Sequence, residues 1–472
     1  MTPGVSGPAP SGPAPPDAVS DPGRISATQS AAQTDPPHAG ATRPAAPSSA
    51  PVSAGPVVSR ADPPRPLRPR PGPLTGLSPF RSPAFRSLFI GTTLTMSGYF
   101  ALTVAQGWLI YDLTGSPTWL GIVAFANGIP MLFLALPAGV LVDRFDRRKI
   151  LVLAQGLTAF TTFLLAGLIW AGRVEAWHVA VLSFAIGCFF VIIVPARQAL
   201  LPTTVERPVL GAAIGLMSAG TNFGRVIGPA LAGVTIALLG ASAAFGAQGI
   251  GFVGALLASL MLPAWAATRS RPRQSSPVQS LLEGLRYVWH DRLVFGLMVL
   301  QAVPAFLIMP YNQLLPIFAR DILATGPEGL GTLMTAMGVG SVAGSVIVVL
   351  LPGRRQGLTL FLSLTILGAL LVAFSASTSM WLSVGLMALV GVAQAIYLAV
   401  NNTLVQLAVP DALQGRVMSV YMTTWGLVPL GALPQGILSD WFGAPVVLAG
   451  AGIVSCVMVA VLAATNRELR RL

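Results

Sequence analysis

Apolar stretches of twenty or more residues recur from Leu88 almost to the end of the chain, separated by short polar segments. Each stretch is long enough to cross about 30 Å of hydrocarbon as a helix. The sequence lacks the short alternating strands that a membrane β-barrel needs. It therefore predicts an all-α membrane protein with twelve transmembrane helices. The predicted spans cover residues 87–112, 117–142, 149–171, 177–200, 210–239, 243–266, 292–319, 329–352, 357–377, 380–406, 415–439 and 443–465.

The composition supports this class. Hydrophobic residues make up 54% of the chain and charged residues only 9%, whereas an ordinary soluble protein carries about 25% charged residues. The formal charge of +12 comes almost entirely from arginines, which fall in alternate loops. By the positive-inside rule these loops and both termini are cytoplasmic. We expect a multi-pass protein of the inner (plasma) membrane and no nucleic-acid partner.

The polar segments suggest a domain organisation. The first 75 residues hold 19 of the 40 prolines, and no aromatic residue precedes Phe80. Such a segment buries too little apolar surface to fold, so we predict a disordered cytoplasmic tail over residues 1–79. This tail is either dispensable or a contact to anionic lipid headgroups or a partner.

A cytoplasmic linker, residues 267–291, is predicted to carry an amphipathic helix and to separate two six-helix halves, residues 80–266 and 292–466. Residues 467–472 would form a cytoplasmic end. Gln198 and Pro202 share their spacing with Gln406 and Pro410, each pair lying near the end of a fourth span. Two such halves with a cavity between them are typical of secondary transporters.

One loop concentrates charge, with six charged side chains among the seven residues from Asp143 to Lys149. With Gly139 it resembles the signature loop of the major facilitator superfamily, except that Asp146 replaces a preferred glycine. The resemblance implies a cytoplasmic gate in which Asp143 contacts the start of helix 11 and an arginine at the foot of helix 4. A carboxylate is favoured at both places. Alternatively, the basic residues only enforce topology. The predicted gate comprises Gly139, Asp143, Arg144, Arg147, Arg148, Lys149, Arg197 and Arg416.

The fifth span contains a second motif, formed by Gly224, Gly228, Pro229 and Gly233. It resembles the glycine-proline motif of exporters and antiporters in this superfamily, with Ala232 in place of one glycine. Small residues at this spacing let helices approach closely, and proline permits a bend. The motif indicates either a hinge or a packing face.

Arg225 lies midway through the same span, where a charge costs from about 3 to over 10 kcal/mol. It should face a cavity or a partner. With Asn222 one turn earlier it suits an anionic or multiply oxygenated ligand. Alternatively, backbone carbonyls or Asp112 satisfy it. No acidic residue after position 80 lies inside a span, so the candidates for proton coupling are Asp112 and Asp440, each of which also fits a helix-end role.

In the superfamily, helices 1, 4, 7 and 10 line the cavity, which nominates a mixed polar and aromatic pocket. Any of these side chains can also simply bond between helices. The two cysteines and three histidines are scattered, so neither a metal site nor another cofactor is expected. The nominated residues are Tyr99, Gln106, Gln301, Tyr311, Asn312, Gln313, Gln394, Tyr397 and Asn401.

Three stretches, Val194–Pro202, Asn222–Pro229 and Gly415–Ser419, resemble the enterobactin-exporter branch, which includes macrolide efflux pumps. The resemblance implies a proton-gradient-driven exporter of a bulky amphiphile, a siderophore or a drug, working by alternating access, and we expect it to be a monomer. Its partners would be the small-molecule substrate, membrane lipids and protons. A lysophospholipid flippase, a metabolite facilitator and, more remotely, a non-transporting receptor or scaffold remain alternatives. An enzyme is not expected, because the chain lacks a suitable acidic or histidine cluster.

Overall fold

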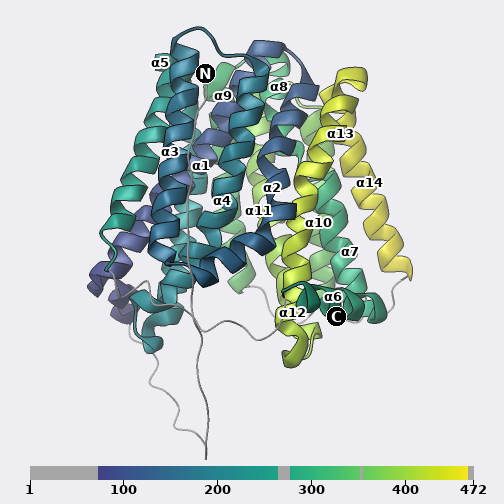
Figure 1. Cartoon of the computed structure of the whole chain (residues 1–472). Helices are drawn as coiled ribbons and strands as arrows, with labels where there is room; N and C mark the ends of the chain where they lie inside the picture. Colours follow the sequence, from purple (N-terminus) through teal and green to yellow (C-terminus); the bar gives the residue numbers. More distant parts are fainter. Residues whose placement is uncertain (1–72, 264–276, 351–354, 466–472) are drawn as a thin grey trace, which may run out of the picture. The chain divides into compact units, whose positions relative to one another are not determined.

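The computed structural model describes residues 73–263, 277–350 and 355–465, and every regular element in these ranges is helical. Figure 1 shows the helices running side by side. The elements are η1 (Pro73–Arg81), α1 (Pro83–Thr114), α2 (Pro117–Arg144), α3 (Arg147–Trp170), α4 (Ala176–Thr204), η2 (Arg207–Val209), α5 (Leu210–Leu260), α6 (Pro277–His290), α7 (Arg292–Leu307), α8 (Tyr311–Ile317), η4 (Phe318–Ile322), α9 (Gly326–Leu350), α10 (Gln356–Ser375), α11 (Met380–Ala408), α12 (Asp411–Thr423), η5 (Thr424–Gly426), α13 (Leu427–Phe442) and α14 (Ala444–Thr465).

The long helix α5 is two antiparallel limbs joined at Gly240, whose φ of +83° breaks the helical backbone. A left-handed conformation of this kind is readily available only to glycine. Later residues of the first limb contact later residues of α1, whereas later residues of the second limb contact earlier residues of α1. The contacts pair Gly220 with Thr93, Gly228 with Ala101, Phe252 with Gly98 and Ser259 with Gly91.

Ten helical segments among the described residues are long and apolar enough to cross a membrane. The second limb of α5 adds one crossing. The stretch from α12 through the short η5 turn to α13 adds another. Together these account for the twelve predicted transmembrane helices, and the predicted all-α membrane fold is confirmed.

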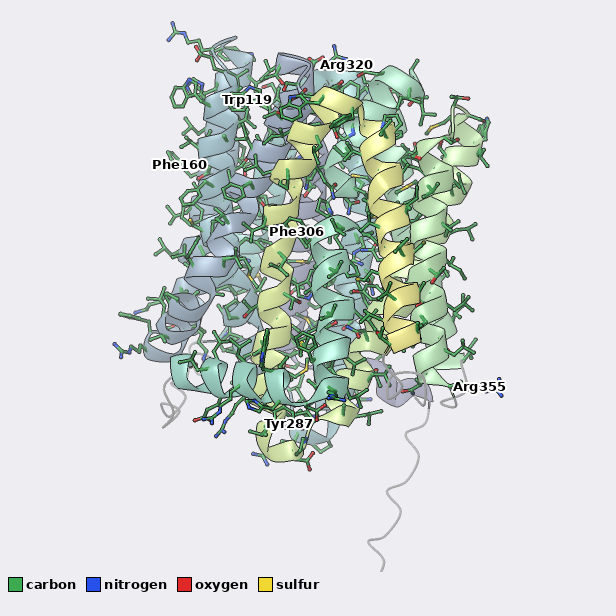
Figure 2. All side chains as sticks on the ribbon, turned by 90° about the vertical axis from the view of Figure 1, so that its right-hand side faces the viewer. Trp119, Phe160, Tyr287, Phe306, Arg320 and Arg355 are labelled. Carbon is green, nitrogen blue, oxygen red and sulfur yellow. The ribbon has the colours of Figure 1, made fainter. Side chains whose placement is uncertain are left out.

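Charged and aromatic side chains mark two opposite ends of the helices. Figure 2 shows Arg320 at one end, and Tyr287 and Arg355 at the other. We call the first the Asp440 end and the second the Arg144 end, after residues of the helix termini there. At the Asp440 end, Trp170 and Trp381 are 84% and 86% exposed, as in the aromatic belt of a membrane interface.

Two segments of the predicted domain map are described. Residues 73–81 form η1, so the end of the predicted tail is helical. The predicted amphipathic segment lies in α6, beside α12 at the Arg144 end (Figure 1), where Arg416 forms an ion pair with Glu283. The rest of the tail, the start of the linker and residues 467–472 lie outside the described ranges, so the domain boundaries stay a prediction.

Two helix pairs join the halves, α5 with α9 and α2 with α13. A Cβ added to Gly331 of α9 would lie 2.8 Å from the Pro229 carbonyl oxygen of α5, so these backbones touch. Likewise a Cβ on Gly436 would lie 2.6 Å from the Pro117 carbonyl oxygen. At the Arg144 end, a Cβ on Gly139 would meet no atom within 4 Å. The pairs therefore pack closely toward the Asp440 end.

Candidate functional site

The halves are tied together at the Asp440 end by two groups of polar contacts. In the first, Arg320 of η4 lies 3.2 Å from the Asp112 carboxylate at the end of α1 and donates to the Tyr111 carbonyl oxygen at 3.2 Å. The Tyr111 hydroxyl donates to the Asp321 carboxylate. Asp112, which the sequence offered as a partner for Arg225, thus pairs with Arg320 instead.

The second group centres on Asp440 of α13. Its carboxylate accepts the Thr118 backbone N–H at 3.0 Å and the Ser116 hydroxyl at 3.1 Å, at the start of α2. The Thr118 hydroxyl donates to it as well. A carboxylate is stabilised at a helix N-terminus, where unpaired N–H groups and the helix dipole meet. Asp440 is therefore a cross-half contact in this conformation.

We predict that Asp440→Asn loosens the Asp440 end, because it removes the charge from these bonds. The probe is the substitution Gln313→Cys in a variant in which Cys188 and Cys456 are replaced by other residues. The new cysteine is labelled by a membrane-impermeant maleimide. Labelling from this end should speed up by roughly three- to tenfold, as for loss of charge-assisted bonds at an exposed site. Glu328→Gln, an exposed acid in the first turn of α9, is the control. Equal labelling rates in both variants would contradict the prediction.

Between the halves, Arg225 of α5 lies 5.4 Å above the Phe100 ring of α1. Its guanidinium lies within electrostatic range of Tyr311 of α8, in the other half. The buried Tyr311 hydroxyl donates to Gln394 of α11 at 3.1 Å. In the described part of the chain Arg225 has no ion-pair or hydrogen-bond partner. The structure thus brings together three predicted binding residues, Arg225, Tyr311 and Gln394. Among the described residues, no carboxylate pairs with the Arg225 guanidinium.

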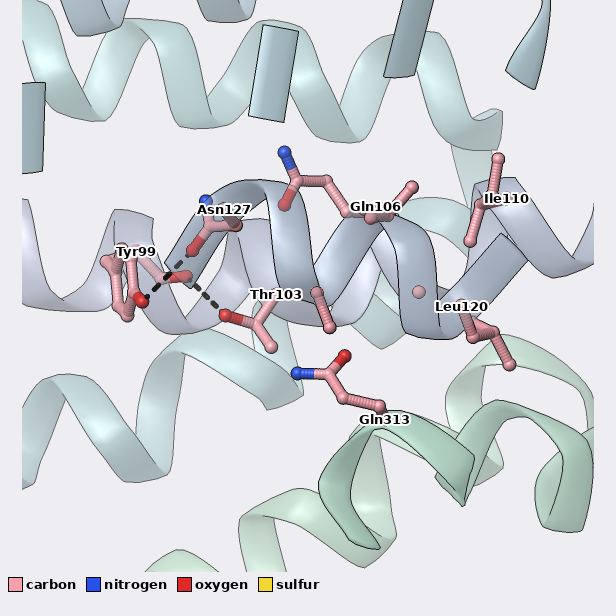
Figure 3. A pocket seen from close by; sticks show the side chains of 10 residues that line it. Tyr99, Thr103, Gln106, Ile110, Leu120, Asn127 and Gln313 are labelled. Atoms are coloured by element: carbon pink, nitrogen blue, oxygen red, sulfur yellow. Dashed lines mark hydrogen bonds between the residues drawn. The ribbon is translucent and has the colours of Figure 1, made fainter. Parts of the chain in front are cut away.

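A small cavity of about 70 Å³ lies nearby, between α1, α2 and α8. Figure 3 shows Tyr99, Gln106, Asn127 and Gln313 around it. The Tyr99 ring stacks on Phe190 with centroids 4.0 Å apart, and its hydroxyl lies 3.4 Å from the Asn127 side-chain oxygen. The amide nitrogen of Gln106 is buried and has no hydrogen-bond partner among residues 73–263, 277–350 and 355–465. This volume holds a few water molecules, so a larger ligand requires the halves to separate.

Other nominated residues lie elsewhere. Tyr397 and Asn401 of α11 and Tyr421 of α12 all contact the side-chain oxygen of Gln301, at 3.0, 3.2 and 3.1 Å. Gln301, Tyr397 and Asn401 are fully buried, so in this structure they bond between helices, which is the alternative reading of the sequence, and do not line the cavity. Asn312 bonds locally to the Met309 carbonyl oxygen.

The predicted gate loop is ordered mainly by bonds within its own half. Asp146, the departure from the signature, is the N-cap of α3 and accepts the Lys149 backbone N–H at 3.1 Å. Arg147 is buried and donates to the Ala199 carbonyl oxygen at 3.2 Å. Arg148 donates to a backbone carbonyl at the end of α5. These side chains fix how α3 begins against α4 and α5.

The predicted gate contact of Asp143 with Arg197 and Arg416 is not formed in this conformation. Asp143 is exposed and, among the described residues, has no bonded partner. Arg416 pairs with Glu283 of α6. Arg197 lines an open cavity of about 370 Å³ together with Asn222, which the sequence had grouped with Arg225. In the part of the chain that the structure describes, the halves are closed at the Asp440 end and open at the Arg144 end.

Comparison with known proteins decides the class. The major facilitator family MFS_3, described as "Transmembrane secretion effector", matches residues 74–472. The chain belongs to this family. It is therefore a multi-pass major facilitator transporter of a small molecule, and not an enzyme, as the resemblance of the Asp143 loop indicated.

Relatives of known function are similar over most of their length. The chain is 26% identical to the staphyloferrin A transporter of Staphylococcus aureus over 81% of this chain and 96% of that protein. It is 29% identical to the multidrug efflux pump Tap of Mycobacterium tuberculosis, covering 77% and 88%. It is also 29% identical to the enterobactin exporter EntS of Shigella boydii, covering 72% and 81%.

The similarity to solved structures bears on the fold and not on the substrate. The nucleoside transporter NupG matches with a TM-score of 0.66 at 12% identity, over 82% of this chain and 99% of that one. The MFS_3 transporter thus shares its architecture with a transporter whose sequence is very different.

Sequence reasoning missed several residues of the site. Asn127 is a lone polar residue in an apolar span, a signal that could have nominated it. Ser116, Thr118 and Asp321 lie at helix ends, where polar residues are common, so nothing in the sequence marked their contacts across the halves.

Proposed function

We propose that this MFS_3 transporter exports a bulky amphiphile with an anionic or oxygen-rich group, a siderophore or a drug, and that a proton gradient drives the export. The observation that carries the proposal is the unpaired Arg225, half-buried between the two halves beside Phe100 and the buried Tyr311. A charged side chain without a partner inside the membrane raises the free energy of the protein. A negatively charged or oxygen-rich ligand would satisfy it, and the aromatic rings nearby suit an apolar or aromatic body.

The named functions of the relatives point the same way, since one transports staphyloferrin A, one exports enterobactin and one is a multidrug efflux pump. In our account the Arg144 end faces the cytoplasm, as the distribution of arginines predicts. A substrate reaches the open end and binds at Arg225. The halves then rock, so that the Asp143 gate closes and the Asp440 contacts part. Asp112 and Asp440 are our candidates for proton coupling, and the transporter is taken to act as a monomer.

The proposal is tested by cellular accumulation of a catechol siderophore and of a macrolide, with and without the protein and with and without a protonophore. We expect lower accumulation of one compound in cells that carry the protein, and its restoration by the protonophore. If neither compound responds while the protein is present in the membrane, siderophore and drug export are both contradicted, and lipid or metabolite transport becomes the better hypothesis.

We predict that Asp143→Asn lowers export about tenfold without loss of membrane insertion. The reason is that the closed gate would lose a charge-assisted contact with Arg197 or with the start of α12, worth about 1.5–3 kcal/mol. Asp146→Asn is the matched control, because asparagine also caps a helix well. Export rate per inserted molecule is the measurement, and normal export by Asp143→Asn would refute the gate.

A further inference from the structure

An apolar groove lies between α5 and α9 on the side toward the Arg144 end. The two helices touch at Pro229 and Gly331 and again at Arg225 and Gly338, and only then diverge. The space between them measures about 720 Å³ and is lined by side chains such as Phe223, Val342 and Val346. Val346 is 56% exposed, and the neighbouring Val349 and Leu350 are more so. Side chains of this kind on a transmembrane helix face lipid, so the groove opens sideways into the membrane.

This groove lies next to the cavity that contains Arg197. Ser218 and Asn222 of α5 line both spaces, with the apolar groove on one side and Thr92 and Arg197 on the other. A molecule lying across these two residues would have apolar surroundings at one end and polar surroundings at the other. The combined site is therefore amphipathic along its length.

Arg197 supplies the charge at the polar end. One of its terminal nitrogens is buried without a hydrogen-bond partner, and no bond or ion pair of its side chain exists among the described residues. A buried guanidinium nitrogen without an acceptor is unfavourable, because that nitrogen has given up water without a replacement. An anionic group in this cavity would remove that cost.

We propose that the groove between α5 and α9 is a lateral access site, through which an amphiphile with a single anionic group enters from the predicted cytoplasmic leaflet. The apolar body lies in the groove against Phe223 and Val346, and the anionic group reaches Arg197 past Asn222. The occupant is the transported molecule itself. The inference rests on the proposed function and adds to it a route and a head-group site separate from Arg225.

The site is tested by photolabelling the full-length protein in nanodiscs of zwitterionic phosphatidylcholine. The probes are a long-chain alkyl sulfonate with a diazirine in its chain and the uncharged alcohol of the same chain. We expect saturable labelling of α5 and α9 around Phe223 and Val346 by the sulfonate. Arg197→Gln should lower it about tenfold at subsaturating probe, Arg197→Lys less, and neither should change labelling by the alcohol.

Two results would overturn the site. Equal sulfonate labelling of Val461, a lipid-facing residue of α14 that is 53% exposed, would indicate annular contact only. Unchanged labelling in Arg197→Gln would remove the head-group site. Neither result depends on export, so the proposed function is judged separately.

The route is tested by filling the groove. Val346→Trp should lower export of the responsive amphiphile at least fivefold, whereas Val461→Trp, a valine of similar exposure outside the groove, should leave it unchanged. Normal export in Val346→Trp would contradict the lateral route while the proposed function stands. If the wild-type protein exports neither test compound, the proposed function fails, and the labelling result still decides whether the site exists.

Discussion

Gly228→Ala is expected to reduce export more than tenfold and to lower the thermal stability of the transporter. A Cβ at this position would lie 2.5 Å from the Ser97 carbonyl oxygen and 3.0 Å from the Ala101 nitrogen of α1. Both are backbone atoms, so no side-chain rotation relieves the overlap, and α1 must move away from α5. Overpacking of this kind typically costs about 1–3 kcal/mol.

The effect on transport should exceed the effect on stability, because α5 lies between α1 and α9. The same helix approaches Gly331 of α9 through Pro229, so displacing it disturbs the contact between the halves. A larger effect on transport than on stability would support a hinge role for the glycine-proline motif over a packing role.

The matched controls are Gly246→Ala and Gly251→Ala in the second limb of α5, where an added Cβ meets no atom within 4 Å. Thermal unfolding in detergent and export per inserted molecule are the measurements. A Gly228→Ala variant as stable and active as these controls would show that the close approach of α1 and α5 is not required.

Arg225→Gln should lower export of an anionic substrate tenfold or more while changing export of a neutral one by less than threefold. A hydrogen bond to a charged group contributes about 1.5–3 kcal/mol, which corresponds to at least tenfold in binding. Glutamine keeps a polar side chain at the position but loses the charge and the contact with the Phe100 ring.

Arg225→Lys separates the two contributions, because lysine keeps the charge and loses the planar group that stacks on an aromatic ring. It should retain part of the preference for the anion. Concentration dependence of export for both substrates is the measurement. An equal loss for anionic and neutral substrates in Arg225→Gln would indicate a structural arginine instead of a binding one.

The twelve helices were predictable because each membrane crossing needs its own apolar stretch, which is visible in the hydropathy of the sequence. Even the reversal at Gly240 was placed within the short gap between predicted spans 210–239 and 243–266. The Asp143 loop and the α5 motif were predictable for a different reason, since short spacings of charge and glycine carry the family resemblance.

The partners of the polar residues inside the helices were not predictable. Tyr397 and Asn401 lie one turn apart on α11 and turn toward Gln301, whereas Gln394, one turn earlier than Tyr397, turns toward Tyr311. These three residues share one face of α11, so the sequence does not show which neighbouring helix supplies the partner of each. The pairing of Asp440 with Thr118 was equally hidden, because it joins residues from different halves.

Conformational state also lies beyond the sequence. The gate loop predicts a closed arrangement around Asp143, whereas the structure is open there and closed around Asp440. Both arrangements belong to one cycle of alternating access. A single structure therefore contains only the contacts of one end.

The central claim, gradient-driven export, is tested most directly in inverted membrane vesicles that contain the transporter. A labelled catechol siderophore or macrolide is added outside, and the vesicle interior is then acidified. We predict that the compound recognised by the transporter accumulates inside against its concentration gradient and leaves again when a protonophore is added. Equal distribution of both compounds with and without the proton gradient, in vesicles shown to contain the inserted protein, would contradict the account.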